Sequence, residues 1–330
     1  MKLNPIFSSH MVFAAKKPIR IYGTGEGKIK ITFAHFSCET LCCDGKWTVE
    51  FPPMEYGGPF VLCVLSENEL IELCDIYVGK VFLFSGQSNM QFKLCDSNFP
   101  CAEYKTNELV RFFCTDRIEA SDFFTAADGW IKCEKENAGN FSAIGYISSQ
   151  IVSERDKVAV GVVACYQGAS VIESWLPAGT YEKLGIELPI EKKHIVHVDK
   201  LFTEWNAKDG TLYERAFSQV VPFSFSAVIW YQGESDSTVD EAAVYDKALC
   251  ELIDVWRNDL CDKKLDFVIV QIADYDKEAG DGWTGIQKAQ EKVAGMREKV
   301  CTVISRDVCE TDNIHPQSKT VLSQRIAEKL

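Results

Sequence analysis

The first 75 residues alternate short β-rich runs with glycine-containing turns. Runs of branched and aromatic residues at partly alternating positions predict strands, and they cover residues 19–22, 29–33, 47–51 and 60–65. Asp44-Gly45 stands just before Trp47 and is typical of a hairpin turn, because Gly tolerates a positive φ. The pattern therefore predicts a small N-terminal β-sandwich over residues 1–75.

The pattern changes after residue 75, where the apolar runs become continuous. Strands buried on both faces of a parallel sheet have this composition, and five runs fit it: residues 76–84, 158–165, 227–231, 267–272 and 300–304. Apolar residues at helical spacing predict amphipathic helices over residues 240–258 and 318–330. Strands that alternate with helices predict a doubly wound α/β domain over residues 76–330.

Polar clusters follow four of the predicted strands directly. The sequence reads SGQSNM at residues 85–90, YQGAS at 166–170, WYQGESD at 230–236 and SRDVCETDNIHP at 305–316. Ligands of open α/β sheets bind beyond the carboxyl ends of the strands. Four polar clusters at that edge indicate a functional site there.

Ser88 and His315 are the candidate nucleophile and base. A serine at a strand-to-helix turn lies near a helix N-terminus, which favours developing negative charge; an ordinary helix-capping serine is the alternative. His315 alone among the five histidines stands just past a predicted core strand, and Asp312 precedes it by three residues. A serine nucleophile needs such a base, and the base needs an orienting carboxylate. A solvated loop histidine is the alternative for His315.

Composition and charge narrow the range of partners. The net charge is −13, and no basic run is longer than Lys192-Lys193, so a nucleic-acid partner is not expected. No run approaches the ~20 apolar residues of a membrane span, and residues 1–17 lack the continuous apolar stretch of a signal peptide. These features predict a cytoplasmic protein without a membrane partner.

Cysteine and histidine spacing gives little sign of a metal or disulfide framework. The 14 cysteines are spread over the chain, several of them within apolar runs, which favours reduced thiols. His194 and His197 form an HxxH pair, but no third ligand is evident nearby. We therefore expect neither a metal site nor a cofactor.

The polar clusters resemble the sequence blocks of one esterase family. SGQSNMQF at residues 85–92 is similar to the nucleophile block of the sialate O-acetylesterase and acetylxylan-esterase-like branch of the SGNH (GDSL-like) hydrolases. WYQGES at 230–235 resembles the third block, DNIHP at 312–316 resembles the block with the acid and base, and residues 161–175 resemble the second block. The β-rich start is also similar, so the resemblance covers nearly the whole chain. Gln167, Ala169 and Asp236 depart from the usual pattern, which weakens any assignment of the sugar.

The resemblance implies a fold and a set of site residues. It implies a flavodoxin-like three-layer α/β/α domain with a parallel sheet, preceded by the small β-sandwich. The implied catalytic triad is Ser88, His315 and Asp312. The backbone N–H groups of Ser88 and Gly168 and the side chain of Gln232 are the implied oxyanion donors, and the implied supporting residues are Gln87, Asn89 and Glu234.

The implied activity is hydrolysis of acetyl esters on sugars, either sialic acid or another acetylated glycan. An acetylxylan esterase and a general small-ester hydrolase are the alternatives within the same chemistry. A non-catalytic carbohydrate-binding protein and a hydrolase that uses Cys165 as its nucleophile are alternatives of other kinds. The oligomeric state stays open at this point.

Overall fold

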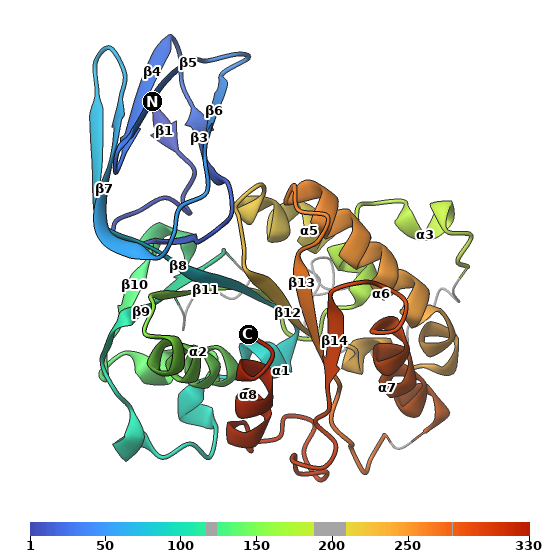
Figure 1. Cartoon of the computed structure of the whole chain (residues 1–330). Coiled ribbons are helices and arrows are strands. Elements are labelled where there is room, and N and C mark those ends of the chain that lie inside the picture. Colours follow the sequence, from blue (N-terminus) through green and yellow to red (C-terminus); the bar gives the residue numbers. More distant parts are fainter. Residues whose placement is uncertain (117–123, 188–208, 279) are drawn as a thin grey trace.

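The computed structural model describes residues 1–116, 124–187, 209–278 and 280–330 of the 330-residue chain. The protein is a mixed α/β structure. The N-terminal strands stand apart at one end of the molecule, and helices flank the other strands (Figure 1).

The N-terminal part contains two small antiparallel arrangements of strands. One is a three-stranded sheet of β1 (Lys2–Leu3), β3 (Ile19–Thr24) and β6 (Lys46–Phe51). The other comprises β4 (Lys28–Phe33), β5 (Phe36–Leu41) and β7 (Gly57–Leu65). The four strands predicted here are confirmed, whereas β1 and β5 are additional. Asp44 and Gly45 both have positive φ, 51° and 73°, as a tight hairpin turn requires.

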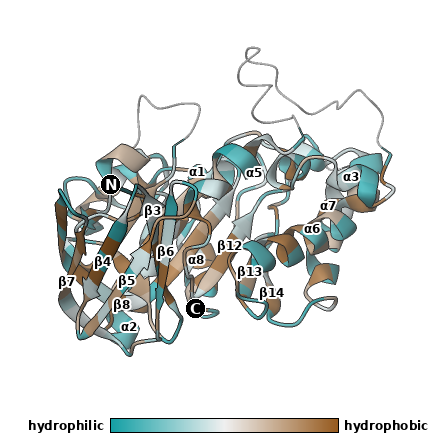
Figure 2. Ribbon diagram, turned by 90° about the horizontal axis from the view of Figure 1, so that it is seen from above, coloured by the Kyte–Doolittle hydropathy of each residue, from teal (hydrophilic) through white to brown (hydrophobic). Residues whose placement is uncertain are grey.

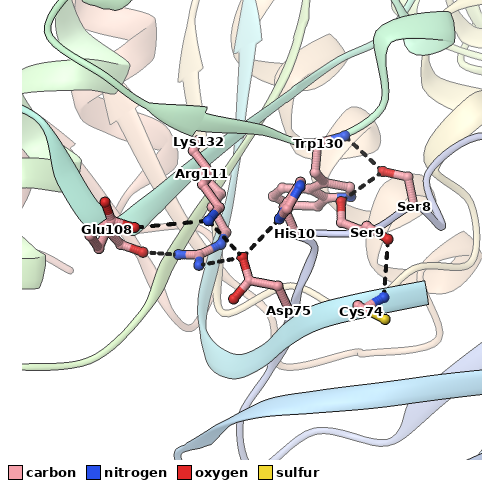
Figure 3. A network of polar contacts seen from close by, with 9 residues as sticks. All are labelled: Ser8, Ser9, His10, Cys74, Asp75, Glu108, Arg111, Trp130 and Lys132. Atoms are coloured by element: carbon pink, nitrogen blue, oxygen red, sulfur yellow. Dashed lines mark hydrogen bonds and ion pairs between the residues drawn. The ribbon is translucent and has the colours of Figure 1, made fainter.

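One long strand, β8 (Leu70–Gly86), connects the two parts of the molecule. Its first half pairs with β7, and β2 (Val12–Ala14) pairs with its middle. The predicted boundary at residue 75 falls inside this strand, at Asp75, whose φ is +58°. Figure 3 shows the polar network around that residue, in which Asp75 meets the side chains of His10, Arg111 and Lys132.

The second half of β8 lies in the middle of the large sheet. The strand order there is β10-β9-β11-β8-β12-β13-β14, and all neighbours pair in parallel except β10 with β9. The five predicted core strands are confirmed, and two strands are additional, β9 and β10. The bounds, in chain order, are β9 (Asn107–Cys114), β10 (Ile131–Cys133), β11 (Val160–Tyr166), β12 (Ala227–Tyr231), β13 (Asp266–Val270) and β14 (Val300–Val303).

Helices cover both faces of this sheet. In Figure 1, α2 (Ala143–Asp156) and α8 (Thr320–Ala327) pack together on one side, and α6 (Val239–Asp259) and α7 (Asp281–Val293) pack together on the other. Figure 2 shows hydrophobic colour on the central strands and mixed colours along α6. The shorter helices are α1 (Ser88–Gln91), α3 (Thr180–Lys183) and α5 (Thr211–Arg215), and 3-10 turns cover Leu94–Asp96, Cys101–Glu103, Ala126–Asp128, Ala138–Asn140, Ile172–Trp175, Phe217–Val220 and Glu234–Asp236.

The two predicted helices are confirmed as α6 and α8. Thr238 and Glu241 start α6 with a capping box, because the Thr238 hydroxyl accepts from the Glu241 N–H and the Glu241 carboxylate accepts from the Thr238 N–H. Buried Tyr245, Leu249 and Trp256 then form its inner face.

All 14 cysteines are free thiols, and four of them are buried: Cys114, Cys133, Cys165 and Cys250. No helix in the described part of the chain is long and apolar enough to cross a bilayer. Over the same residues, no group of three or more His, Cys, Asp or Glu is arranged to hold a metal ion. His194 and His197 lie outside the described residues.

Candidate active site

Ser88 occupies the sharp turn between β8 and α1. The turn depends on Gly86, whose φ is +132° and where an added Cβ would lie 2.0 Å from the Tyr231 carbonyl oxygen. Only glycine permits that approach. The chain then donates the Gln87 N–H to the same carbonyl, at 2.9 Å, and Ser88 becomes the first residue of α1. The turn thus presents Ser88 at the carboxyl edge of the sheet.

His315 meets Ser88 across this edge. It lies on the loop between β14 and α8, and its Nε2 is 2.8 Å from the Ser88 Oγ. Both residues line a cleft of about 170 Å³, together with Gln91, Phe92, Lys93 and Asp96. The candidate nucleophile and the candidate base, 227 positions apart in the sequence, are therefore in hydrogen-bond contact in an accessible hollow.

The surroundings of His315 favour its neutral form. Burial lowers the pKa of the imidazole below its ordinary value, and the positive charge of Lys319 lowers it further. A neutral imidazole can accept the serine proton. The backbone N–H of His315 donates to the Asn313 Oδ1 at 2.9 Å, which fixes the local turn.

Asp312 is not assembled with the pair. Its side chain is exposed, and it forms no hydrogen bond or ion pair with any residue that the structure describes. The other two carboxylates of the loop are engaged elsewhere: Asp307 binds Arg325, and Glu310 accepts from the N–H groups of Gln317 and Ser318.

Gly168, the oxyanion donor that the family resemblance implies, lies beside Ser88. A Cβ on Gly168 would lie 3.7 Å from the Ser88 Cβ. The Gly168 N–H donates to the Gln91 side-chain oxygen at 2.9 Å. In this structure the Gly168 N–H therefore has the Gln91 side chain as its acceptor.

Gln232 does not reach the cleft. It is fully buried, and its two amide N–H groups donate to the Ser170 carbonyl at 2.9 Å and to the Asp236 carboxylate at 2.5 Å. The Tyr245 hydroxyl donates to its side-chain oxygen. Both amide donors of Gln232 therefore hold two loops together in this structure, and its role as an oxyanion donor stays a prediction.

Gln87, Asn89 and Glu234 form the layer beneath the nucleophile. The Gln87 side-chain oxygen accepts from the N–H groups of Gly233 and Ser235, at 3.2 and 3.4 Å. The Asn89 amide donates to the Glu234 carboxylate at 2.6 Å and to the Ile314 carbonyl at 2.9 Å. All three side chains are buried, so they brace the loops around Ser88 from below.

Cys165 does not fit the role of a nucleophile. It is fully buried, and burial raises the pKa of its thiol to about 12. The reactive form of cysteine is the thiolate. Ser88 is thus the nucleophile that the geometry supports.

Two residues near Ser88 and His315 could not be identified from the sequence as part of the site. Gln91 stands within the SGQSNMQF block but carries no sign of its contact with Gly168. Lys319 follows His315 by four residues, and lysine is almost never fully buried. Neither residue type nor spacing distinguishes them from surface positions.

Comparison of the sequence with known protein families identifies the family of this chain. The model of the family described as "Carbohydrate esterase, sialic acid-specific acetylesterase" matches residues 78–330, more than three quarters of the chain. Among curated proteins, the chain is 24% identical to sialate O-acetylesterase of Pongo abelii over 314 residues and 24% identical to that of Mus musculus over 334 residues. These matches cover 85% of this chain but only 59% and 62% of the relatives.

A solved structure is similar over almost the whole chain. It is a novel carbohydrate acetylesterase from Xanthomonas citri, 25% identical, with a TM-score of 0.86. The match covers 99% of this chain and 74% of that one.

Proposed function

Because this chain belongs to the carbohydrate esterase family of sialic acid-specific acetylesterases, we propose that it hydrolyses acetyl esters on sugars through Ser88. The observation that carries the proposal is the 2.8 Å contact between the Ser88 Oγ and the His315 Nε2 in an open cleft. The resemblance of three sequence blocks and the geometry of two distant residues support the same chemistry.

The reaction follows from that contact. His315 accepts the Ser88 proton at Nε2 while the Ser88 oxygen bonds to the acetyl carbonyl carbon. The sugar alkoxide then leaves and takes that proton from His315. A water molecule, activated by the same nitrogen, hydrolyses the acetyl-serine and regenerates the hydroxyl.

Charge on the tetrahedral oxygen needs donors beside Ser88. We assign this role to the backbone N–H groups of Ser88 and Gly168. Each such donor is worth about 3 to 4 kcal/mol in comparable sites. Since the Gly168 N–H donates to Gln91 in the free protein, the substrate carbonyl has to displace the Gln91 amide before it can bind there.

Asp312 is the proposed orienting acid. It lies on the same loop as His315, and the two other carboxylates of that loop, Asp307 and Glu310, are held by other partners. A carboxylate on the imidazole Nδ1 holds the tautomer that leaves Nε2 free to accept. In this structure Asp312 has still to turn towards His315 to do so.

The cleft favours a small acyl group. Pockets that enclose drug-sized ligands measure roughly 300–1,000 Å³, and this cleft measures about 170 Å³. An acetyl group fits such a space, whereas the sugar extends outside it. Sialic acid and other acetylated glycans, xylan among them, are therefore the proposed substrate class.

The strand order supports the finer assignment of the fold. Without the edge strands β9 and β10, the sheet reads β11-β8-β12-β13-β14, which in chain order is 2-1-3-4-5. Flavodoxin-like sheets have this order. We propose that residues 76–330 form a flavodoxin-like SGNH-hydrolase domain with helices on both faces and that residues 1–75 form a small β-sandwich.

Acetate release from a panel of substrates tests the proposal. The panel contains O-acetylated sialic acids, acetylated xylan and p-nitrophenyl acetate. We expect release from at least one acetylated glycan, and loss of that release in Ser88→Ala. A folded protein that releases no acetate from any of these esters contradicts the proposed function.

A further inference from the structure

Lys319 is a charged residue in an unusual place. It immediately precedes α8 and is fully buried. Burial lowers the pKa of its ammonium group to about 8, while the nearby Cys309, Glu234 and Glu310 act in the opposite direction. Burying an ammonium group is costly unless hydrogen bonds and nearby groups compensate for the lost water, and Lys319 has several such contacts.

The contacts of Lys319 converge on Asn89. Its Nζ donates to the Asn89 Oδ1 at 2.8 Å and lies over two aromatic rings, 5.0 Å from the centre of Phe92 and 5.6 Å from the centre of Tyr231. The Asn89 amide nitrogen faces the opposite way, towards the Glu234 carboxylate at 2.6 Å. The Lys319 ammonium group on the oxygen side and the Glu234 carboxyl group on the nitrogen side hold the amide in this orientation.

That orientation reaches both halves of the catalytic pair. Asn89 directly follows Ser88, and its amide nitrogen also donates to the carbonyl of Ile314, which directly precedes His315. If the amide were reversed, its oxygen would face the Ile314 carbonyl and the Glu234 carboxylate. The loop that carries His315 would then lose its hydrogen bond to the turn that carries Ser88.

We propose that Lys319 is a positioning residue that locks Asn89, and through it the His315 loop, against the Ser88 turn, and that it holds a positive charge behind His315, over the Phe92 ring that lies beside that imidazole. The proposal rests on the esterase function proposed above. Lys319 acts behind the cleft and does not touch the substrate.

The charge of Lys319 is present over the relevant pH range. Its pKa of about 8 lies above the lowered pKa of His315, so Lys319 is protonated wherever His315 titrates. Two other charged residues, Lys93 and Asp96, line the cleft with His315, and the test leaves both unchanged. A shift in the titration of His315 in a Lys319 variant therefore reports the loss of the Lys319 charge.

Two variants separate the charge from the hydrogen bond. Lys319→Met removes both, and Lys319→Gln keeps an amide donor without the charge. With p-nitrophenyl acetate, we expect Lys319→Met to lose about 10- to 100-fold in kcat, because small misplacements of reacting groups are costly. In both variants the acid limb of kcat/KM should move to higher pH by about 0.5 to 1 pH unit. Lys319→Gln should recover part of the kcat.

Lys329→Met is the matched control, because it removes an exposed lysine ten residues further along. It should leave kcat and the acid limb unchanged. An unchanged acid limb in folded Lys319→Met and Lys319→Gln overturns the electrostatic role, and an unchanged kcat in Lys319→Met overturns the positioning role.

A measurement that needs no activity keeps the inference separate from the proposed function. In the Ser88→Ala background, an NMR titration of the His315 imidazole should give a higher pKa when Lys319 is also changed to Met or Gln, because burial lowers this pKa in every variant and only the Lys319 protein carries the extra positive charge. An equal pKa in the folded variants with and without Lys319 overturns the electrostatic role. If the wild-type protein hydrolyses no ester but the pKa values differ in this way, the proposed function fails while the electrostatic role stands.

Discussion

The catalytic cleft and the junction between the two parts of the molecule each place a histidine against an oxygen. At the junction, the His10 Nδ1 lies 2.7 Å from the Asp75 carboxylate; in the cleft, the His315 Nε2 lies 2.8 Å from the Ser88 hydroxyl. The distances are alike, but the surroundings differ in charge. At the junction, Arg111 and Lys132 surround the Asp75 carboxylate, whereas in the cleft the His315 imidazole lies near the buried cation Lys319.

The junction is electrostatically balanced. One Asp75 oxygen is 3.2 Å from Arg111 and 3.2 Å from Lys132, in addition to its contact with His10 (Figure 3). His10 and Asp75 both have positive φ, 73° and 58°, a backbone conformation that is uncommon outside glycine. Their mutual contact holds that bend in β8, so the polar groups there serve the fold.

The cleft is arranged differently. His315 has a hydroxyl partner and a lowered pKa, and Asp312 stands apart from it. Groups that keep a neutral base ready for proton transfer contribute little to stability, and active sites commonly have this property. The contact between His10 and Asp75 therefore belongs to a network that supports the fold, whereas the contact between His315 and Ser88 is the one for which we propose a chemical role.

The largest effect on activity is expected from the nucleophile. Ser88→Ala should reduce kcat for p-nitrophenyl acetate by about 10⁴- to 10⁶-fold, because the acyl-enzyme cannot form. Thermal unfolding should stay close to that of the wild type, since Ser88 contributes little packing. Ser66→Ala, in the N-terminal part, is the matched control and should keep full activity. A soluble Ser88→Ala protein with near wild-type turnover refutes the assignment.

Asp312→Asn comes next, and it tests whether the cleft needs a carboxylate. In a comparable triad this change cost about 10⁴ in kcat. We expect a severe loss here and an acid limb of kcat/KM that moves to lower pH, because the carboxylate that we propose to turn onto His315, and so to favour its charged form, is removed. Asp307→Asn, which breaks only the contact with Arg325, should stay within a few-fold of wild type. If Asp312→Asn retains its activity and the acid limb of its kcat/KM profile is unchanged, Ser88 and His315 act as a dyad.

The central strands could be predicted from the sequence, because their apolar runs are unbroken, but β9, β10 and the long helices α2 and α7 could not. β9 contains Arg111, which is 1% exposed and interrupts the apolar run, yet pairs with Asp75 in space. In α2, Ser148, Ser149 and Gln150 are buried beside apolar residues, so no apolar stripe appears. Buried polar residues, whose partners are distant in sequence, interrupt both the apolar run of the strand and the helical spacing of apolar residues. Neither pattern can then be recognised in the sequence.

The part of the site that could be predicted contains residue types with few possible chemical roles at the end of a strand. Ser88 and His315 meet because both follow core strands, and the carboxyl ends of parallel strands share one edge. The hydrogen bonds that use both amide donors of Gln232 could not be predicted, because its partners Ser170 and Asp236 leave no recognisable pattern in the sequence. Lys319 was invisible because lysine ordinarily lies at the surface.

A moderate effect is expected from Gln91→Ala. In the free protein the Gln91 oxygen accepts from the Gly168 N–H, so it competes with the substrate carbonyl. Removing a neutral hydrogen bond of about 0.5 to 1.5 kcal/mol should lower KM by about 2- to 10-fold. Steady-state kinetics with p-nitrophenyl acetate measures this, with Gln317→Ala at an exposed position as the control. A kcat loss of tenfold or more shows instead that Gln91 donates to the oxyanion.

The smallest effect on activity is expected from Asp75→Asn, which changes the junction and leaves the cleft intact. Asn tolerates the positive φ of this position, so the bend in β8 is preserved and only the charge is lost.

Burial raises the pKa of Asp75, but the hydrogen bond from His10 and the charges of Arg111 and Lys132 hold it below its ordinary value. A carboxyl with a lowered folded-state pKa stabilises the fold above its unfolded pKa, and this stabilisation disappears as the pH falls through the folded value. Asp75→Asn should therefore unfold more readily at pH 7, by about 1 to 3 kcal/mol, while the difference from wild type shrinks and disappears as the pH falls through the lowered folded-state pKa of Asp75. Denaturant unfolding between pH 2 and 7 measures this, and Glu108→Gln, which removes a more distant acidic partner of Lys132, should change little. A difference that is equal at every pH assigns the loss to packing, and a parallel loss of kcat at pH 7 would show that the junction and the cleft are coupled.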